Sequence, residues 1–287
     1  MSEPMGILGI GAVTPIGRKL ADIAERLKES GSNPPRGIRA GEELLAEAAI
    51  SKRMRRADRF SRMAAVAAID AWKQAAHSCE QIARERIGLI VTSGFGPHCR
   101  GFRFLDGLLD CGDSAASPTD FSHSVHGTAA AYITELLELR GPSLSTTDFE
   151  VGFEEAVLLA QCWLEDQTCQ RVLVGAVEEL GEVMLHCVGR MIVPEQPTIL
   201  GEGALFFMLG PRTAGAIATL FATAAANRRA PRTTDDSEHF LCRSATDSAF
   251  RLLAALLSPD GENPAVVGAS SGLRDTALVV TRTASKS

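Results

Sequence analysis

Apolar residues along the chain follow two periods, and these predict strands that alternate with helices. Three- and four-residue spacing of apolar positions predicts helices at 128–139 and 246–257. The same spacing predicts an alanine-rich helix across residues 60–75, and Asp58 is its expected N-cap. Short, nearly continuous apolar runs predict strands at 87–91, 172–177, 204–209 and 216–221. This alternation is typical of a layered α/β fold.

Residues 141–157 predict a strand, a turn and the start of a helix. The run Ser143–Thr147 is rich in hydroxyl and β-branched residues, which favours a strand. Apolar residues then recur at helical spacing, at Phe153, Ala156, Val157, Ala160 and Leu164. Asp148 and Glu150 therefore fall in the turn between strand and helix. The free N–H groups at a helix start favour negative charge, so this turn suits a carboxylate.

This segment resembles the nucleophile loop of the β-ketoacyl synthases of the thiolase fold, whose Thr-Ala-Cys-Ala-Ser-Gly sequence carries the acyl-accepting cysteine. When the two patterns are aligned without gaps, Glu150 takes the place of that cysteine. Other segments resemble family motifs in the same order, at residues 9–17, 55–63, 90–96, 124–130, 173–178 and 200–204. The resemblance implies an α/β chain with the thiolase-like layered α-β-α-β-α fold.

The second half of the chain departs from the family pattern. An active synthase of this family has two histidines there, one in a His-Gly-Thr-Gly-Thr loop and one in a later Gly-His segment. After Leu209 this chain has one histidine, His239, in neither context. Residues 269–280 still resemble the closing loop and strand of the family. We therefore expect residues 1–210 to form the N-terminal half and residues 211–287 a shortened C-terminal half that completes the same domain.

The missing groups predict that the chain does not catalyse condensation. Condensation uses a thiolate as nucleophile because the resulting thioester divides the reaction into two accessible steps. A carboxylate such as Glu150 would give a reactive mixed anhydride. The absent histidines would stabilise developing charge, an effect often worth about 3 to 4 kcal/mol per donor. The sequence thus predicts a pseudoenzyme of this acyltransferase family, without catalytic residues, cofactor or metal.

The family works as dimers, and some type II polyketide systems pair an active ketosynthase with an inactive chain-length factor. The resemblance implies that the strand Ser143–Thr147 pairs with a partner copy, since a free sheet edge exposes unpaired backbone groups. Our hypothesis is a chain-length-factor-like subunit that forms a heterodimer with a full-length ketosynthase. It would shape the acyl tunnel of that partner and meet acyl carrier protein indirectly, in polyketide or fatty acid biosynthesis that includes aryl polyenes. The candidate interface or tunnel residues are Phe104, Leu105, Leu108, His126, Ser143, Ser145, Thr147, Phe149, Glu150 and Phe153.

Other hypotheses remain open at the level of sequence. Glu150 could act as a base or an electrostatic group in decarboxylation of malonyl carriers, and the chain could be a scaffold that binds acyl groups or carrier proteins. Gly9-Ile-Gly11 resembles the start of a dinucleotide fingerprint, but Thr14 stands where the third glycine would be. Several histidines and cysteines could be read as metal ligands, but their spacing matches no standard zinc pattern; they are His98, Cys99, Cys111, His123 and His126.

Composition narrows the function classes further. The chain has 287 residues, 45% of them hydrophobic, which is enough for a large core. Its 29 basic and 35 acidic residues give a net charge of −6, which argues against a nucleic-acid surface. It has no apolar run of membrane-spanning length and no signal pattern, and its seven cysteines lack paired spacing. We therefore expect a cytoplasmic protein with reduced thiols. Residues 227–237 are the clearest candidate for low order.

Overall fold

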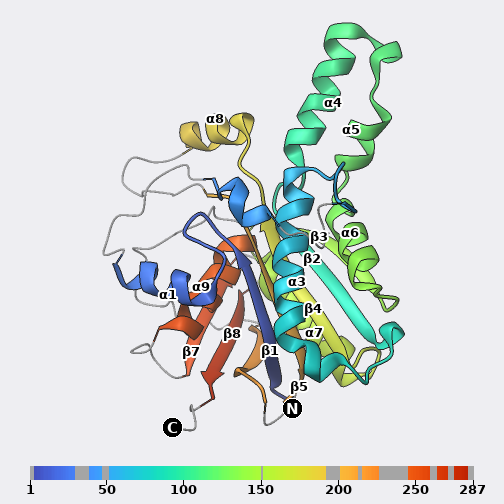
Figure 1. Cartoon of the computed structure of the whole chain (residues 1–287). Helices are drawn as coiled ribbons and strands as arrows, with labels where there is room; N and C mark the ends of the chain where they lie inside the picture. The colour runs from blue at the N-terminus through green and yellow to red at the C-terminus, as the bar shows by residue number, and fades with distance from the viewer. Residues whose placement is uncertain are drawn as a thin grey trace.

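The computed structural model describes residues 3–29, 39–46, 52–149, 151–191, 201–212, 215–225, 245–258, 264–270 and 275–283. Within these residues the chain forms one mixed eight-stranded sheet in the order β3-β2-β4-β5-β1-β6-β8-β7 (Figure 1). The strands are β1 (Met5–Val13), β2 (Ile87–Ser93), β3 (Ser143–Thr147), β4 (Arg171–Glu178), β5 (Gly203–Pro211), β6 (Ala218–Ala225), β7 (Ala265–Ser270) and β8 (Asp275–Arg282).

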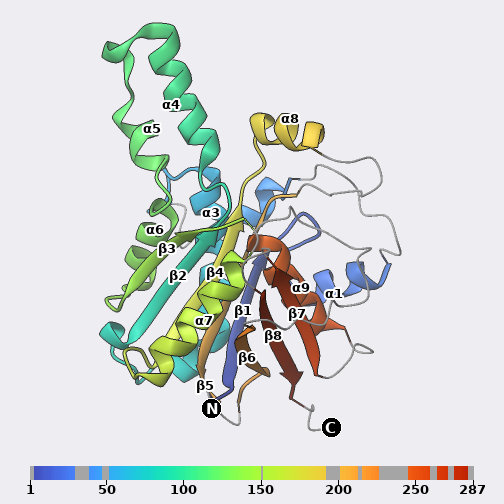
Figure 2. The ribbon, with the colours of Figure 1, turned by 180° about the vertical axis from the view of Figure 1, so that it is seen from behind.

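Helices lie on both faces of this sheet, as the view from behind in Figure 2 also shows. The α-helices are α1 (Leu20–Glu29), α3 (Arg59–Cys79), α4 (His98–Cys111), α5 (Pro118–His123), α6 (Thr128–Leu137), α7 (Gly152–Glu165), α8 (Glu182–Met191) and α9 (Ala245–Leu257). Short 3-10 turns lie at Glu42–Leu45, Arg84–Arg86 and Asp113–Ala115.

The alanine-rich helix α3 covers one face of the sheet at very short range. Asp58 caps its start, because the Asp58 Oδ1 accepts a hydrogen bond of 2.7 Å from the Ser61 N–H. On the facing strand β1, a side chain at Gly9 or Gly11 would overlap the backbone of α3 at Ala71 or Ala67. The Gly9-x-Gly11 pattern therefore serves helix-to-strand packing.

Helices α7 and α9 lie between two sections of the sheet. Helix α9 contacts both β4 and β7, although four strands separate these two in the sheet. At about 4.8 Å per strand spacing, β4 and β7 would be about 24 Å apart in a flat sheet, too far for one helix to contact both. The sheet therefore curls around α7 and α9. The pairing between β1 and β6 is short and joins only Met5–Ile7 to residues 218–220 in the described chain. The described part of the chain therefore has four layers: helix α3, the first section of the sheet, helices α7 and α9, and the second section of the sheet.

The mixed α/β architecture expected from the sequence is confirmed, and so are most of the predicted elements. Strand β3 has the predicted bounds. Helix α6 ends at Leu137, two residues earlier than predicted, because Glu138 adopts a left-handed conformation with φ of 54°. Strand β6 begins at Ala218, two residues later than predicted.

Some parts of the chain were not predicted. Helices α1, α4, α5 and α8 and strand β7 had no sequence-based expectation. Residues 227–237, the expected low-order segment, lie outside the described residues. Among the described helices, none combines the length and apolar character that crossing a membrane requires.

Candidate functional site

The turn between β3 and α7 is the position of the expected nucleophile. Asp148 follows β3, and its Oδ1 accepts a hydrogen bond of 2.8 Å from the Val151 N–H just before α7. Glu150 itself lies outside the described residues. The described side chains of this turn thus place a carboxylate at the helix start, where the free N–H groups favour negative charge.

Strand β3 is the edge of the sheet at this end. It pairs in parallel with β2, from Leu89↔Ser143 to Ser93↔Thr147. In the described part of the chain no strand lies on its other side. Ser143, Leu144 and Thr147 are exposed, and Leu144 has 39% of its surface accessible.

Phe149 continues this surface beside a buried glutamate. It is 52% exposed and packs edge to face against Phe95, with ring centroids 4.8 Å apart. Below this pair, the Glu178 carboxylate at the end of β4 accepts hydrogen bonds from the Gly94 and Phe95 N–H groups. Burial is the main cause that raises the Glu178 pKa, to about 7. Glu178 therefore ties the end of β4 to the end of β2.

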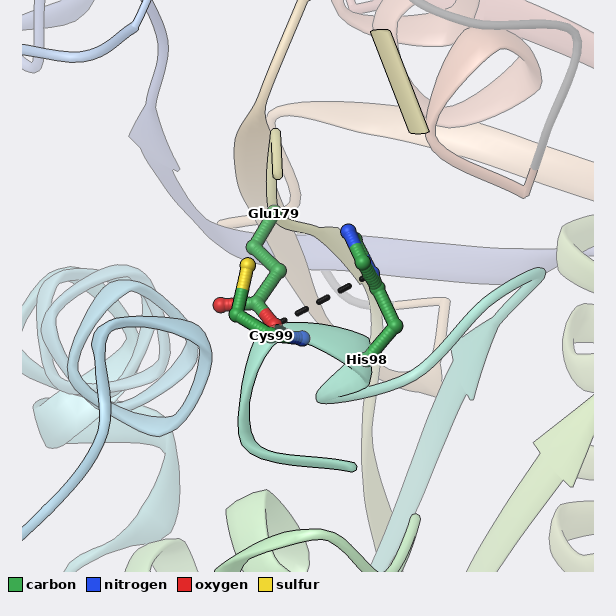
Figure 3. Close-up of side chains that lie close together, drawn as sticks. All are labelled: His98, Cys99 and Glu179. Atoms are coloured by element: carbon green, nitrogen blue, oxygen red, sulfur yellow. Dashed lines mark hydrogen bonds and ion pairs between the residues drawn. The ribbon is translucent and has the colours of Figure 1, made fainter. Parts of the chain in front are cut away.

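The loop from β2 to α4 brings a histidine and a cysteine to the end of β4. Gly96 has φ of +64°, which favours glycine, and the chain then enters α4 at His98. The Nδ1 of His98 lies 3.2 Å from the Gly96 carbonyl oxygen, and the Glu179 carboxylate accepts a hydrogen bond of 2.8 Å from the Cys99 N–H. Figure 3 shows the three side chains gathered between the start of α4 and the end of β4.

The atoms of this group are close, and two of the three side chains are largely withdrawn from solvent. One ring nitrogen of His98, the Cys99 Sγ and a Glu179 carboxylate oxygen all lie within 4.8 Å of one another. The side chains of His98 and Glu179 are 9% and 3% exposed, whereas Cys99 is exposed. Nitrogen, thiolate sulfur and carboxylate oxygen are the donors that bind zinc in proteins.

Burial is the main cause of the pKa shifts of His98, Cys99 and Glu179. It lowers the pKa of His98, which favours the neutral imidazole, and raises the pKa of Glu179 to about 7. Burial first and the Glu179 carboxylate second raise the pKa of the Cys99 thiol to about 12. Near neutral pH the group thus holds a neutral imidazole, a thiol and a carboxyl group close to its midpoint.

A cavity of about 530 Å³ opens beside His98, Cys99 and Glu179. Charged residues from three parts of the chain line it, among them Arg39, Arg59 and Glu182. A separate and larger cavity, of about 1070 Å³, lies beside α1 and is lined by Arg18 and Asp70. Several carboxylates line that cavity, but among the described residues no three of its His, Cys, Asp or Glu side chains cluster as His98, Cys99 and Glu179 do.

Glu202 forms hydrogen bonds with two residues that line the smaller cavity, Arg59 and Leu180. Its carboxylate is fully buried and accepts hydrogen bonds from the Ala40 N–H at 2.8 Å and the Leu180 N–H at 3.2 Å. Both carboxylate oxygens also contact the Arg59 Nε, at 3.0 and 3.2 Å. Glu202 is therefore a structural residue that joins three distant segments.

Helices α4 and α5 form a hairpin that extends beyond the sheet (Figure 1). Phe104 on α4 packs against Phe121 on α5 with ring centroids 5.4 Å apart. Another face of α4 carries Phe102, Leu105 and Leu109, which are 39%, 49% and 83% exposed. These positions share one side of the helix, since they are spaced by three and four residues. We name this row the α4 apolar stripe.

The structure brings most of the predicted site residues to one side of the molecule. Phe104, Leu105 and Leu108 are on α4, exposed His126 lies against Gly96, and the exposed or half-buried β3 residues adjoin Phe149. Phe153 is the exception. It is fully buried in α7 and packs against Phe207 of β5 at 5.6 Å, so it lies on the buried face that the apolar spacing of this helix predicted.

The sequence did not anticipate Glu179 as a site residue, because it lies 80 residues from Cys99. A local spacing pattern does not reveal groups that only the sheet brings together. The other proposed metal ligands are not part of this group: His126 lies against Gly96, His123 bonds the Tyr132 hydroxyl at 2.9 Å, and Cys111 is exposed at the far end of α4.

Comparison with known proteins identifies the family. The family model described as "Beta-ketoacyl synthase, N-terminal domain" matches residues 33–188. A curated relative, the 3-oxoacyl-[acyl-carrier-protein] synthase 2 of Coxiella burnetii, is 26% identical over 152 residues. That match covers 48% of this chain and 37% of the relative, so the chain spans little more than a third of the relative's length.

Solved structures share the fold at low identity. A type II PKS acyl-carrier protein in complex with its ketosynthase bound to the hexaketide matches with a TM-score of 0.79 and 16% identity, over 99% of this chain and 100% of that chain. The ishigamide ketosynthase/chain length factor matches with a TM-score of 0.74 and 15% identity, over 98% and 100%. A ketosynthase in complex with its chain length factor from Xenorhabdus doucetiae gives a TM-score of 0.64 and 15% identity, over 96% and 99%.

Proposed function

Because the chain belongs to the β-ketoacyl synthase family, we propose that it is a non-catalytic, chain-length-factor-like subunit that pairs with an active ketosynthase. The observation that carries this proposal is the turn between β3 and α7. It has the family's strand, turn and helix, but the chain has Glu150 in place of the cysteine. The pair would act in cytoplasmic type II polyketide or fatty acid biosynthesis, aryl polyenes included, and the partner would bind the acyl carrier protein.

The exposed edge of β3 supports a partner. An edge strand presents backbone N–H and C=O groups that a second strand can satisfy, and association closes the edge. Strand β3 offers five residues for such pairing, and the exposed Leu144 adds an apolar contact. A ketosynthase is the appropriate partner, because the family shares the same strand and turn.

The α4 apolar stripe supports the same partner. The hairpin of α4 and α5 lies on the same side of the molecule as β3 in both Figure 1 and Figure 2. Its exposed Phe102, Leu105 and Leu109 would leave water on association, each favoured by about 25 cal/mol per Å² of apolar surface buried. A hairpin that reaches beyond its own sheet can contact the partner's active-site entrance and border its acyl tunnel.

Co-expression with the ketosynthase encoded nearest to this chain tests the proposal. We expect the two proteins to purify as a 1:1 complex by size-exclusion chromatography with light scattering. Leu109→Asp should abolish or strongly weaken that complex, because it places a charge at an 83% exposed apolar contact without disturbing the core. Ala21→Asp on α1, at the opposite side of the molecule, is the matched control and should leave the complex intact.

Two results would contradict the proposal. One is separate elution of both wild-type proteins across micromolar concentrations. The other is carbon dioxide release from malonyl-carrier protein by the purified chain, lost in Glu150→Ala, which would instead support the decarboxylase hypothesis.

A further inference from the structure

We propose that His98, Cys99 and Glu179 bind one zinc-class divalent metal ion at the junction of α4 and β4. This inference goes beyond the proposed function, because it is argued from the donor atoms of these three side chains and needs no partner. It begins from the approach of three donor atoms to within 4.8 Å of one another.

The orientation of His98 favours metal binding. Its Nδ1 lies at hydrogen-bonding distance from the Gly96 carbonyl oxygen, 3.2 Å, which fixes the proton on Nδ1. The Nε2 then carries a free lone pair, and it is buried without a hydrogen-bond partner in a side chain that is 9% exposed. Ligating histidines in proteins usually have this arrangement, in which the second ring nitrogen donates to a carbonyl or carboxylate.

Gly181 shows where Nε2 and the Cys99 sulfur converge. A Cβ atom added to Gly181 would lie 2.7 Å from the Cys99 Sγ and 2.7 Å from the His98 Nε2. Both donors therefore face the same small space, which glycine leaves open. The ring nitrogen that lies 3.9 Å from the Glu179 carboxylate is Nδ1. The His98 and Glu179 side chains therefore have to rotate to bring Nε2, Sγ and a carboxylate oxygen to the spacing of about 3.3 to 3.8 Å that zinc bonds of about 2.0 to 2.3 Å require.

Charge and coordination number are also suitable. A Cys99 thiolate and a Glu179 carboxylate together offset the charge of a divalent cation, and binding releases to solvent the thiol proton and the proton of any protonated Glu179. Three protein ligands leave a fourth position, which faces the cavity of about 530 Å³ and would hold water. The mixed nitrogen, sulfur and oxygen donors favour zinc over magnesium or calcium.

Metal binding would connect the hairpin to the body of the protein. His98 and Cys99 belong to the first turn of α4, and Glu179 follows β4. The side chain of Pro97 provides no cap for α4, and the Glu179 carboxylate instead accepts a hydrogen bond from the Cys99 N–H of its first turn. The ion would add a second link at this end of the helix that carries the α4 apolar stripe.

Cobalt titration of the tag-free, full-length chain tests this site. Co²⁺ substitutes for zinc, and a thiolate ligand gives it a charge-transfer absorption band in the near ultraviolet. We expect the band to saturate at one equivalent, to disappear in Cys99→Ser, and to persist in Cys111→Ser, which alters an exposed cysteine of the same helix. Zinc affinity measured by competition with a chromogenic chelator should fall at least tenfold in His98→Gln, at least as much as loss of an outer-shell group costs.

Gly181→Ala gives a second variant that retains all three ligands. Its methyl group should separate the Sγ and Nε2 atoms and weaken cobalt binding, with the circular dichroism spectrum of the metal-free protein as the check on folding. The proposal is overturned if wild type shows no thiolate band, or if Cys99→Ser binds cobalt with the same band and affinity. Either result would leave the association with a ketosynthase untouched.

Discussion

At the scale of single residues, the Arg59 cluster shows how burial decides the value of an ion pair. Arg59 pairs with Glu202, which is 0% exposed, and with Glu42, which is 67% exposed. Glu202→Ala should lower the free energy of unfolding by about 3 kcal/mol or more, because it leaves a partly buried guanidinium and two backbone N–H groups without their acceptor. Glu42→Ala should cost less than about 1 kcal/mol. Urea denaturation of both variants measures the difference, and equal losses would contradict the structural role of Glu202.

Glu154 predicts a dependence of stability on pH. It lies on α7 against α9, where burial first and the nearby Asp247 raise its pKa from 4.5 to about 7, while Ser248 and Arg251 act in the opposite direction. The unfolded chain releases this proton at lower pH than the folded chain, so stability falls as pH rises from about 4.5 to about 7. Above about pH 7 the buried charge of Glu154 lowers the free energy of unfolding by its full amount, on the order of 3 kcal/mol.

Glu154→Gln should therefore stabilise the protein at pH 8 and make the decline between pH 4.5 and 7 smaller, while the raised pKa values of Glu178 and Glu179 keep part of it. Thermal and urea unfolding across this range measure the effect. The neighbouring Glu155→Gln, at a partly exposed position, is the control and should retain the wild-type profile. If Glu154→Gln retained it as well, the assigned pKa shift would be wrong.

At the scale of elements, two glycines show that the same residue has opposite roles in a strand and a helix. A Cβ at Gly11 would collide with the backbone of α3, whereas a Cβ at Gly107 on α4 would meet nothing within 4 Å. Gly11→Ala should thus destabilise the protein by about 2 kcal/mol or more through overpacking. Gly107→Ala should be neutral or stabilise α4 by up to about 1 kcal/mol. Melting temperatures distinguish the two, and a tolerated Gly11→Ala would show that β1 and α3 pack less tightly than described.

The sequence predicts elements well where local pattern and tertiary packing agree. Helix α3 has a capping Asp58 and a buried alanine face, and β3 is a short β-branched run. Helix α4 was missed because it buries none of its residues: Phe102, Leu105 and Leu109 keep helical spacing, but they are 39%, 49% and 83% exposed. A periodicity argument assumes that the apolar face is in the core, and here that face is exposed.

At the scale of the whole molecule, the curl of the sheet determines which residues meet. It brings β6, β8 and β7 around α7 and α9, so residues after 215 share a core with the first half of the chain. It also explains why the candidate site was only partly predictable. Resemblance to the family located the turn at Asp148, but Glu179 and Cys99 meet through the adjacency of β2 and β4, which local spacing does not encode.

The central claim is that this chain contributes shape to a ketosynthase pair and takes no acyl group itself. The most direct measurement is intact-protein mass spectrometry of the purified pair after incubation with acyl-carrier protein loaded with substrate. We expect an acyl mass increase on the ketosynthase and none on this chain. An acyl adduct on this chain, retained after denaturation, would contradict it.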